Sequence, residues 1–363
     1  MRTEFENILR AVKQLPDREP HLKTLPKFWT VPAQAFHASE VVRLLKPLGF
    51  EIEPQIFELA QKAKRLTRMH RQHYSKRVVD GLRPWQGRAL DFIDTLEGRA
   101  MIAARVGAGK SPVPLAWAWC NRDAIQRVLV VAPANVVYKW ALKEVPQWTG
   151  WQAQVLDSSK THIDLDKQVH VVSYDILRRR LRELMEIEWD LAVLDEFHYI
   201  KQPKSQRTRA AKMLCMGIPY LLFLSGTPMP NRTIELFTPL HLLDPAGWPD
   251  YYRFGWQYAG GQTEEGLFKG ASNLEDLRRR LQTIMFQPSA EELNRQTPKL
   301  TRIAVPVDVP LTEYREVARN VKDAILALSP KSKGYWTNVL DKMNLLRQAI
   351  GRAKVGQAVE WAT

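Results

Sequence analysis

The sequence predicts an α/β fold in which helices flank a parallel β-sheet, and three observations predict it. After Gly81, short apolar runs rich in valine and leucine alternate with segments of helical length, which is the order of elements in parallel sheets. The runs are almost continuously apolar, as in strands buried on both faces. The first run leads into a glycine-containing turn followed by Lys110 and Ser111, the place of a phosphate-binding loop in such folds.

Composition limits the class of protein. Hydrophobic residues make up 45% and charged residues 25% of the 363 residues, which is typical of a globular protein with a sizeable core. The sequence holds no apolar run near the ~18 residues that a membrane span needs, and its charged N-terminus differs from a secretory signal. Its two cysteines provide neither a disulfide framework nor metal-ligand spacing. We therefore expect a cytoplasmic protein without a membrane partner.

The charge balance favours a polyanionic partner. The net charge is +14, from 53 Lys and Arg against 39 Asp and Glu, and such an excess is typical of proteins that bind nucleic acid. A positive surface that serves only solubility is the alternative. The basic stretch 62–77 contains seven Lys or Arg, two His and no acidic residue. It is either a solvated helix face or a surface that meets phosphates.

Residues 1–77 predict a small α+β module that ends in this basic helix. Residues 27–33 form a predicted strand, and residues 35–50 form an amphipathic helix that Gly49 ends. A further helix begins at Pro54 and runs into the basic stretch.

Residues 78–245 predict the main α/β lobe. In parallel sheets, ligands bind beyond the carboxyl ends of the strands, so the polar residues after each apolar run are the candidate site. The predicted strands are 100–105, 127–133, 169–175, 191–196 and 220–226.

Two segments follow the main lobe. Residues 246–300 are rich in aromatic residues and glycine and then become helical, which predicts a helical insertion outside the sheet. In residues 301–363, a strand-like run at 302–311 precedes helical sequence that continues to Thr363.

The stretch "AARVGAGKSP" at 103–112 predicts a phosphate-binding loop, although an alanine stands where the simplest pattern has its first glycine. Gly107 and Gly109 allow the turn, and backbone N–H groups around Ala108 would cradle phosphate oxygens. Lys110 would reach the β- and γ-phosphates, and the Ser111 hydroxyl would bind Mg²⁺. The following prolines fall in the first helical turn, where backbone N–H groups lack partners anyway. A flexible turn without a ligand is the alternative.

Two further strand ends carry polar residues. Asp195 and Glu196 end the predicted strand 191–196, where Asp195 would hold Mg²⁺ and Glu196 would deprotonate a water molecule. A solvated pair of acids is the alternative. Ser225 lies at the end of the strand 220–226 and Thr227 directly follows it, in a position to sense the γ-phosphate, or simply to cap a turn. Before the first strand, the Gln86 amide offers both a donor and an acceptor to an adenine edge.

Taken in order, these segments resemble the Snf2 family of superfamily 2 nucleic-acid-dependent ATPases, which are P-loop NTPases. The N-terminal "KFWTVPA" and "LLKPLGFEI" are similar to the module that precedes the ATPase in bacterial and annealing-helicase-like members. The segments that resemble the family's motifs are "LRPWQ" (Q motif), "ARVGAGKS" (I), "VLVVAPANVVYKWALKEVPQW" (Ia), "VVSYDIL" (Ib), "DEFHYIKQPKSQRTRAA" (the DEAH box) and "LSGTPMPNRTIELFTPLHLLDP" (III).

The resemblance implies a RecA-like lobe that binds ATP with Mg²⁺ and moves along double-stranded or branched DNA. It implies that Gln86, with Arg83 beside it, contacts the nucleotide, and that Lys110, Asp195 and Glu196 are catalytic. It implies a nucleoid-associated protein in a bacterium or phage and a nuclear one in a eukaryote. The residues that would couple the site to DNA are His198, Ser225 and Thr227, and those that would face DNA are Asn135, Lys139, Lys201 and Arg232.

The chain departs from the family pattern at several points. Ala104 and Arg105 stand where motif I usually has an acidic pair, Phe197 replaces the alanine of the box, and 286–293 lacks paired arginines. Motifs IV to VI, with their arginine finger, have no counterpart in this sequence. A missing arginine finger costs about 10³–10⁵ in rate in related phosphoryl-transfer enzymes. We therefore expect this chain to bind ATP and DNA but to hydrolyse ATP slowly without a second RecA-like lobe, in cis or in trans.

Two other hypotheses are open at this stage. The chain is alternatively a natural half-protein that binds DNA and nucleotide without a motor cycle. A small-molecule kinase with a P-loop is the third hypothesis, but it leaves the basic stretch and the segments similar to motifs Ia and III unexplained.

Overall fold

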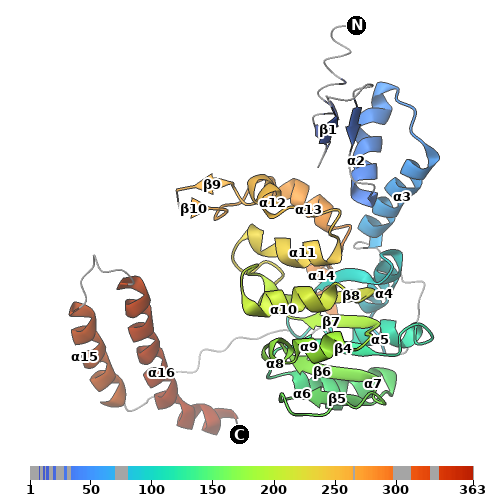
Figure 1. The fold of residues 1–363 in the computed structure, drawn as a ribbon. Coiled ribbons are helices and arrows are strands. Elements are labelled where there is room, and N and C mark those ends of the chain that lie inside the picture. The colour runs from blue at the N-terminus through green and yellow to red at the C-terminus, as the bar shows by residue number, and fades with distance from the viewer. Residues whose placement is uncertain are drawn as a thin grey trace. The chain divides into compact units, whose positions relative to one another are not determined.

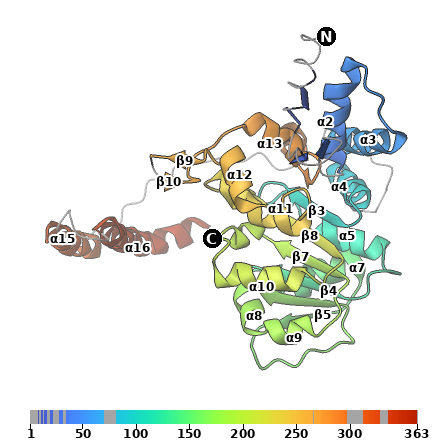
Figure 2. The ribbon, with the colours of Figure 1, turned by 45° about the horizontal axis from the view of Figure 1, so that its top comes forward.

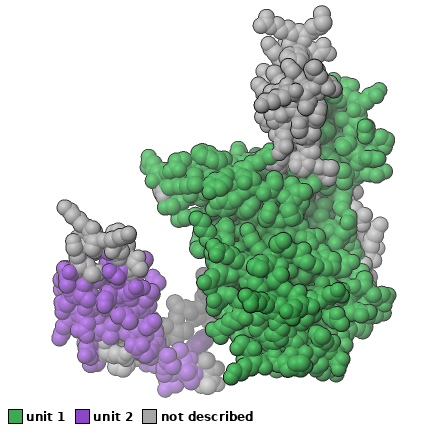
Figure 3. Space-filling model, in the orientation of Figure 1, with its two compact units in different colours: residues 1–298 green, residues 299–363 purple. Residues whose placement is uncertain are grey.

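The computed structural model divides the chain into two compact units, Met1–Pro298 and Lys299–Thr363 (Figure 3). Residues 1–77 and 246–298 lie in the same unit as the sheet. The structure describes residues 8, 11–12, 14–15, 19–21, 28–30, 34–69, 81–264, 266–296, 312–327 and 335–362.

Unit 1 is built around a seven-stranded sheet in the order β11-β3-β8-β7-β4-β6-β5 (Figure 1). All paired strands of this sheet run parallel, so their carboxyl ends share one edge. The strands are β3 (Arg99–Ala103), β4 (Val128–Ala132), β5 (Ala153–Leu156), β6 (Val169–Ser173), β7 (Leu191–Asp195), β8 (Tyr220–Ser225) and β11 (Met285–Phe286).

The predicted parallel sheet and its five predicted strands are confirmed, and two strands were missed. β5 is a half-buried edge strand with the polar Gln154 in its middle, so its apolar pattern is weak. β11 has only two residues, which pair with Met101 and Ile102 of β3. The expectation that 246–300 lies outside the sheet is wrong at this point, because β11 extends the sheet at its β3 edge.

Side chains alternate between two apolar cores, one on each face of the sheet. In β3, Met101 and Ala103 enter one core, while Ala100 and Ile102 enter the other. The first core is covered by α8 (Tyr174–Arg179), α9 (Leu181–Met185), α10 (Gln206–Cys215), η3 (Phe197–Ile200), η4 (Thr233–Leu236) and α11 (Phe237–Leu243). The second is covered by α4 (Pro84–Thr95), α5 (Pro112–Cys120), α6 (Val137–Lys139), the π-helix η2 (Trp140–Glu144), α7 (Val145–Thr149) and α14 (Ala290–Gln296).

Smaller elements lie beside the sheet (Figure 2). The predicted strand at 27–33 corresponds to β2 (Phe28–Thr30). The predicted helix at 35–50 corresponds to α2 (Ala35–Leu45) and η1 (Lys46–Leu48), which Gly49 follows in the left-handed region. The basic stretch begins within α3, and its residues from His70 onward lie outside the described residues. The smaller elements beside the sheet are β1 (Glu19–His21), β2 (Phe28–Thr30), α2 (Ala35–Leu45), η1 (Lys46–Leu48), α3 (Pro54–Met69), α12 (Tyr251–Tyr258), β9 (Gln262–Thr263), β10 (Gly266–Leu267) and α13 (Leu274–Leu281).

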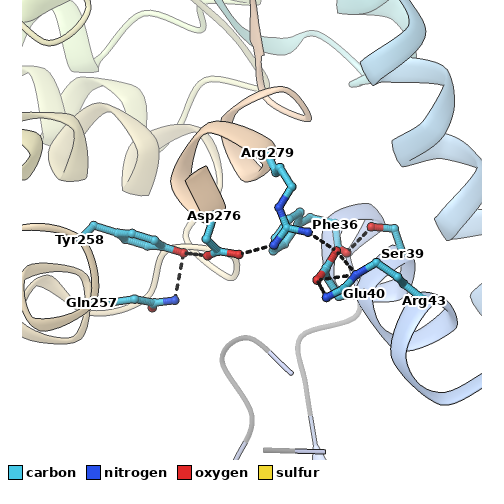
Figure 4. A network of polar contacts seen from close by, with 8 residues as sticks. All are labelled: Phe36, Ser39, Glu40, Arg43, Gln257, Tyr258, Asp276 and Arg279. Atoms are coloured by element: carbon cyan, nitrogen blue, oxygen red, sulfur yellow. Dashed lines mark hydrogen bonds and ion pairs between the residues drawn. The ribbon is translucent and has the colours of Figure 1, made fainter. Parts of the chain in front are cut away.

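A polar network ties the N-terminal helix α2 to α13, more than 230 residues later (Figure 4). The buried Glu40 carboxylate pairs with Arg43 at 2.6 Å and with Arg279 at 3.2 Å. Arg279 also contacts Asp276 at 2.9 Å, and Asp276 accepts a hydrogen bond from the Tyr258 hydroxyl at 2.7 Å. Because a buried charge is costly unless it is paired, this network fixes how α2 docks on α12 and α13.

Unit 2 contains α15 (Thr312–Leu326) and α16 (Tyr335–Ala362), which pack against each other. Val321 and Ala349 are buried in this pair. The helical sequence expected here is confirmed, whereas the predicted strand 302–311 lies outside the described residues. In the described part of the chain, the helices are all too short or too polar to cross a membrane.

Candidate nucleotide-binding site

The loop between β3 and α5 turns at two glycines with positive φ. Gly107 and Gly109 have φ of +80° and +88°, a region in which other residues are strained. Ser111 precedes α5, and Pro112 occupies its first turn as expected. The loop passes close to the end of β8, since a Cβ atom on Gly226 would lie 3.0 Å from the Val106 side chain.

Lys110 points from this loop toward the acidic pair at the end of β7. Its side chain is only 9% exposed, and Nζ donates to the Ala104 carbonyl oxygen at 2.9 Å. The same Nζ lies 3.8 Å from Glu196 Oε1. Burial lowers the pKa of Lys110, and the carboxylates of Glu196 and Asp195 oppose this effect. The lysine and the two acids predicted to act together are therefore brought together.

Asp195 lies at the carboxyl end of β7 with both carboxylate oxygens hydrogen-bonded. Oδ2 accepts from the Trp140 indole Nε1 at 2.9 Å, and Oδ1 accepts from the Glu196 backbone N–H at 3.0 Å. Burial raises the pKa of Asp195, whereas the hydrogen bond from Trp140 lowers it. The Tyr174 hydroxyl donates to the Asp195 backbone oxygen at 2.8 Å, which holds the strand end from the other face.

Glu196 adopts a left-handed backbone conformation, with φ of +50°. This region is sparsely populated by residues other than glycine, and such strain is found at functional sites. Glu196 Oε2 accepts from Ser225 Oγ at 3.1 Å and from the Gly226 N–H at 3.2 Å. Its carboxylate therefore bridges the ends of β7 and β8.

His198 and Thr227 complete this cluster. His198 Nδ1 lies 3.2 Å from Glu196 Oε2 and 3.4 Å from Ser225 Oγ. The Thr227 backbone N–H donates to Ser225 Oγ at 3.0 Å. His198 and Ser225, predicted to couple the site to DNA, thus contact Glu196 through their side chains, whereas the Thr227 backbone contacts Ser225.

The Gln86 amide is bound to the loop between β3 and α5. Its Nε2 donates to the Gly109 carbonyl oxygen at 2.6 Å, and its Oε1 accepts from the Arg83 N–H at 2.6 Å. The Arg83 guanidinium donates to the Ala108 carbonyl oxygen at 2.9 Å. The segment expected to read adenine therefore supports the turn that would hold phosphates.

The four residues expected to face DNA lie on loops and short helices that follow the strands. Asn135, Lys139 and Arg232 are exposed. Lys139 pairs with Glu144 at 3.0 Å, and Lys201 pairs with Glu235 at 3.0 Å. Lys201 and His198 line a pocket of about 700 Å³ whose other lining residues are Asp175, Arg178, Tyr199, Gln202, Ser205, Gln206 and Arg207.

The structure explains two residues that depart from the family pattern. Arg105 donates to Asn294 Oδ1 at 2.7 Å and to the Leu293 carbonyl oxygen at 3.0 Å, so it ties the loop to α14. Phe197 is fully buried in the core, with its ring 6.2 Å from that of Phe223. The sequence alone offered no signal for Arg105, because its partners lie almost 190 residues later.

The oxygen donors of this site fit Mg²⁺ carried by a nucleotide. Ser111 offers a hydroxyl and Asp195 a carboxylate, the hard ligands that Mg²⁺ prefers. Within the described residues, no group of three His, Cys, Asp or Glu side chains could hold a metal by itself. Mg²⁺ is commonly held by one or two protein oxygens together with substrate phosphates, and this donor set fits that arrangement.

Comparisons with known proteins agree with this architecture. The family model of the SNF2-related domain matches residues 37–353. An archaeal structure, the Sulfolobus solfataricus SWI2/SNF2 ATPase core in complex with dsDNA, has the same fold, with a TM-score of 0.52 and 21% identity over 77% of this chain and 60% of that one.

Curated relatives are longer than this chain. The chain is 26% identical over 335 residues to the Xenopus laevis SWI/SNF-related matrix-associated actin-dependent regulator of chromatin subfamily A-like protein 1. The matched region covers 89% of this chain and 34% of that protein. It is 22% identical over 299 residues to the mouse DNA annealing helicase and endonuclease ZRANB3, covering 77% and 27% of the two chains. The chain thus spans between about a quarter and a third of the length of these relatives. Because the family model covers most of its residues, the chain belongs to the SNF2-related family, and its sheet is the RecA-like sheet of that family.

Proposed function

We propose that this chain is the first ATPase lobe of a DNA-dependent, Snf2-type translocase that couples ATP hydrolysis to movement on double-stranded or branched DNA. The observation that carries the proposal is the 3.8 Å approach of Lys110 Nζ to Glu196, with Glu196 in turn bound to Ser225 and His198. This geometry brings a phosphate-binding cation, an acidic pair and a linked polar cluster to one edge of the sheet.

Each residue has a role in the proposed reaction. The loop N–H groups and Lys110 bind the phosphates, and Ser111 with Asp195 holds Mg²⁺, which neutralises charge on the phosphates when bound. Glu196 accepts a proton from the attacking water. Its hydrogen bonds from Ser225 Oγ and the Gly226 N–H orient its carboxylate, so a shift of the β8 end would move the base.

DNA binding is supported by the net charge of +14 and by exposed cationic residues beyond the strand ends, including Lys139 and Arg232. The archaeal relative of the same fold is described in complex with dsDNA. We further propose that a second RecA-like lobe, in cis or in trans, supplies the groups that complete hydrolysis. The protein would then act where DNA is, in a nucleoid or a nucleus.

The experiment that tests the proposal compares ATP hydrolysis by this chain with no DNA, with single-stranded DNA, with duplex DNA and with forked DNA. We expect Mg²⁺-dependent ATP binding, salt-sensitive duplex binding and slow turnover that duplex or forked DNA stimulates. Turnover of several per second by the chain alone would contradict the need for a second lobe. Failure to bind ATP with Mg²⁺ would contradict the proposed function itself.

A further inference from the structure

Among the described residues, Trp140 alone donates a side-chain hydrogen bond to the Asp195 carboxylate. Its indole Nε1 lies 2.9 Å from Oδ2. Trp140 is only 1% exposed and belongs to the core on the α4 and α5 face of the sheet. The bond therefore joins a buried core residue to the carboxylate proposed to hold Mg²⁺.

An indole is well suited to hold a carboxylate that must bind a metal ion. It donates a single hydrogen bond and carries no charge, so it does not compete with a cation as lysine or arginine would. Each carboxylate oxygen has two acceptor sites. Trp140 uses one on Oδ2 and the Glu196 N–H uses one on Oδ1, which leaves one site on each oxygen.

Trp140 is itself held by an unusual backbone. It begins the π-helix Trp140–Glu144, which interrupts the path from α6 to α7. Single π-turns are rare in proteins overall, but those that occur are often found at functional sites. A π-turn places a side chain where an α-helix would not. The ion pair between Lys139 and Glu144 at 3.0 Å joins the residue before this segment to its last residue.

We propose that Trp140 is a positioning residue that orients the Asp195 carboxylate for Mg²⁺-bound nucleotide. The inference rests on the proposed function of the site. It assigns to the π-helix a role in metal-dependent nucleotide binding in addition to its role in the core.

Two substitutions separate the hydrogen bond from the packing. Trp140→Phe keeps an aromatic ring but removes the donor. Trp140→His loses the six-membered ring of the indole, but its Nε2–H can occupy the ring position of the indole N–H. Trp117→Phe is the matched control, because Trp117 is also buried and donates its indole N–H to a carboxylate, that of Asp94, at 2.7 Å.

The measurement is the affinity of each variant for a fluorescent ATP analogue with Mg²⁺ and with EDTA, at pH 8, beside its thermal unfolding. We expect Trp140→Phe to weaken binding about tenfold with Mg²⁺, the scale of one hydrogen bond to a charged group, with little change in EDTA. We expect Trp140→His to retain most of the effect of Mg²⁺, and Trp117→Phe to resemble the wild type.

The outcomes distinguish the inference from the function on which it rests. If the wild type binds the analogue more tightly with Mg²⁺ and Trp140→Phe does the same, the positioning role is overturned. It is also overturned if Trp140→His loses the effect of Mg²⁺ while Trp140→Phe keeps it, because packing alone would then matter. A wild type without any effect of Mg²⁺ overturns the proposed function.

Discussion

Arg105 and Asn294 are joined by a hydrogen bond of 2.7 Å from the guanidinium to Oδ1. Arg105 follows the first strand of the main lobe, and Asn294 lies in α14. A second contact lies beside it, since the buried Arg88 of α4 pairs with the buried Glu292 of α14 at 2.5 Å. α14 therefore contacts both the loop between β3 and α5 and the helix α4, whose first turn supports that loop.

The two contacts of α14 are expected to differ in their contribution to stability. Glu292→Ala removes the carboxylate from a buried guanidinium, which typically costs about 3–5 kcal/mol. Arg105→Ala removes hydrogen bonds at the surface and should cost about 1 kcal/mol or less. Urea unfolding of the two variants measures the difference. As a control, the double variant Arg88→Met with Glu292→Leu should recover most of the lost stability, because it leaves no unpaired charge. Equal losses for Glu292→Ala and Arg105→Ala would show that burial does not set the ranking.

Phe197→Ala introduces the residue that the family resemblance favours, yet it should destabilise this chain. Phe197 is fully buried beside Phe223, so truncation leaves a cavity and costs about 3–5 kcal/mol. Denaturant unfolding measures this, with Phe197→Leu as a control that should cost less because it retains most of the volume. A neutral Phe197→Ala would mean that the core closes around the smaller side chain.

Lys110 and Glu196 should separate nucleotide binding from hydrolysis. Lys110→Ala removes a cation near the phosphates and should weaken ATP binding at least about tenfold, while salt-sensitive DNA binding persists. Glu196→Gln keeps the shape of the side chain but removes the base, so turnover should fall about 10²–10⁴-fold with nucleotide affinity nearly unchanged. Equilibrium binding and steady-state hydrolysis test both, and full turnover by Lys110→Ala would refute the assignment of the site.

Stability should fall on acidification in part because of His170. Burial lowers the pKa of this histidine below its ordinary value of 6.5, so the unfolded chain binds more protons than the folded one just below that pH. The contribution of neutral His170 to the free energy of unfolding is complete above about pH 6.5. It is lost as the pH falls toward the pKa of the folded state, by at most about 1.4 kcal/mol per pH unit. Unfolding free energies between pH 8 and 5 measure this slope, and His170→Leu should make it shallower. An unchanged slope in that variant would assign the pH dependence to other groups.

The parallel sheet, five of its strands and the loop at 103–112 could be predicted from the chain alone, because apolar runs, glycines and strand-end acids are local signals. The sequence also indicated that Lys110, Asp195 and Glu196 act at one site, since the carboxyl ends of parallel strands share one edge. The contacts that support this site become visible only in the folded chain. The contacts of Trp140 with Asp195, Gln86 with Gly109 and Arg105 with α14 join residues 23 to 189 positions apart. Such pairs leave no periodic pattern in the chain, because packing of the folded elements brings them together.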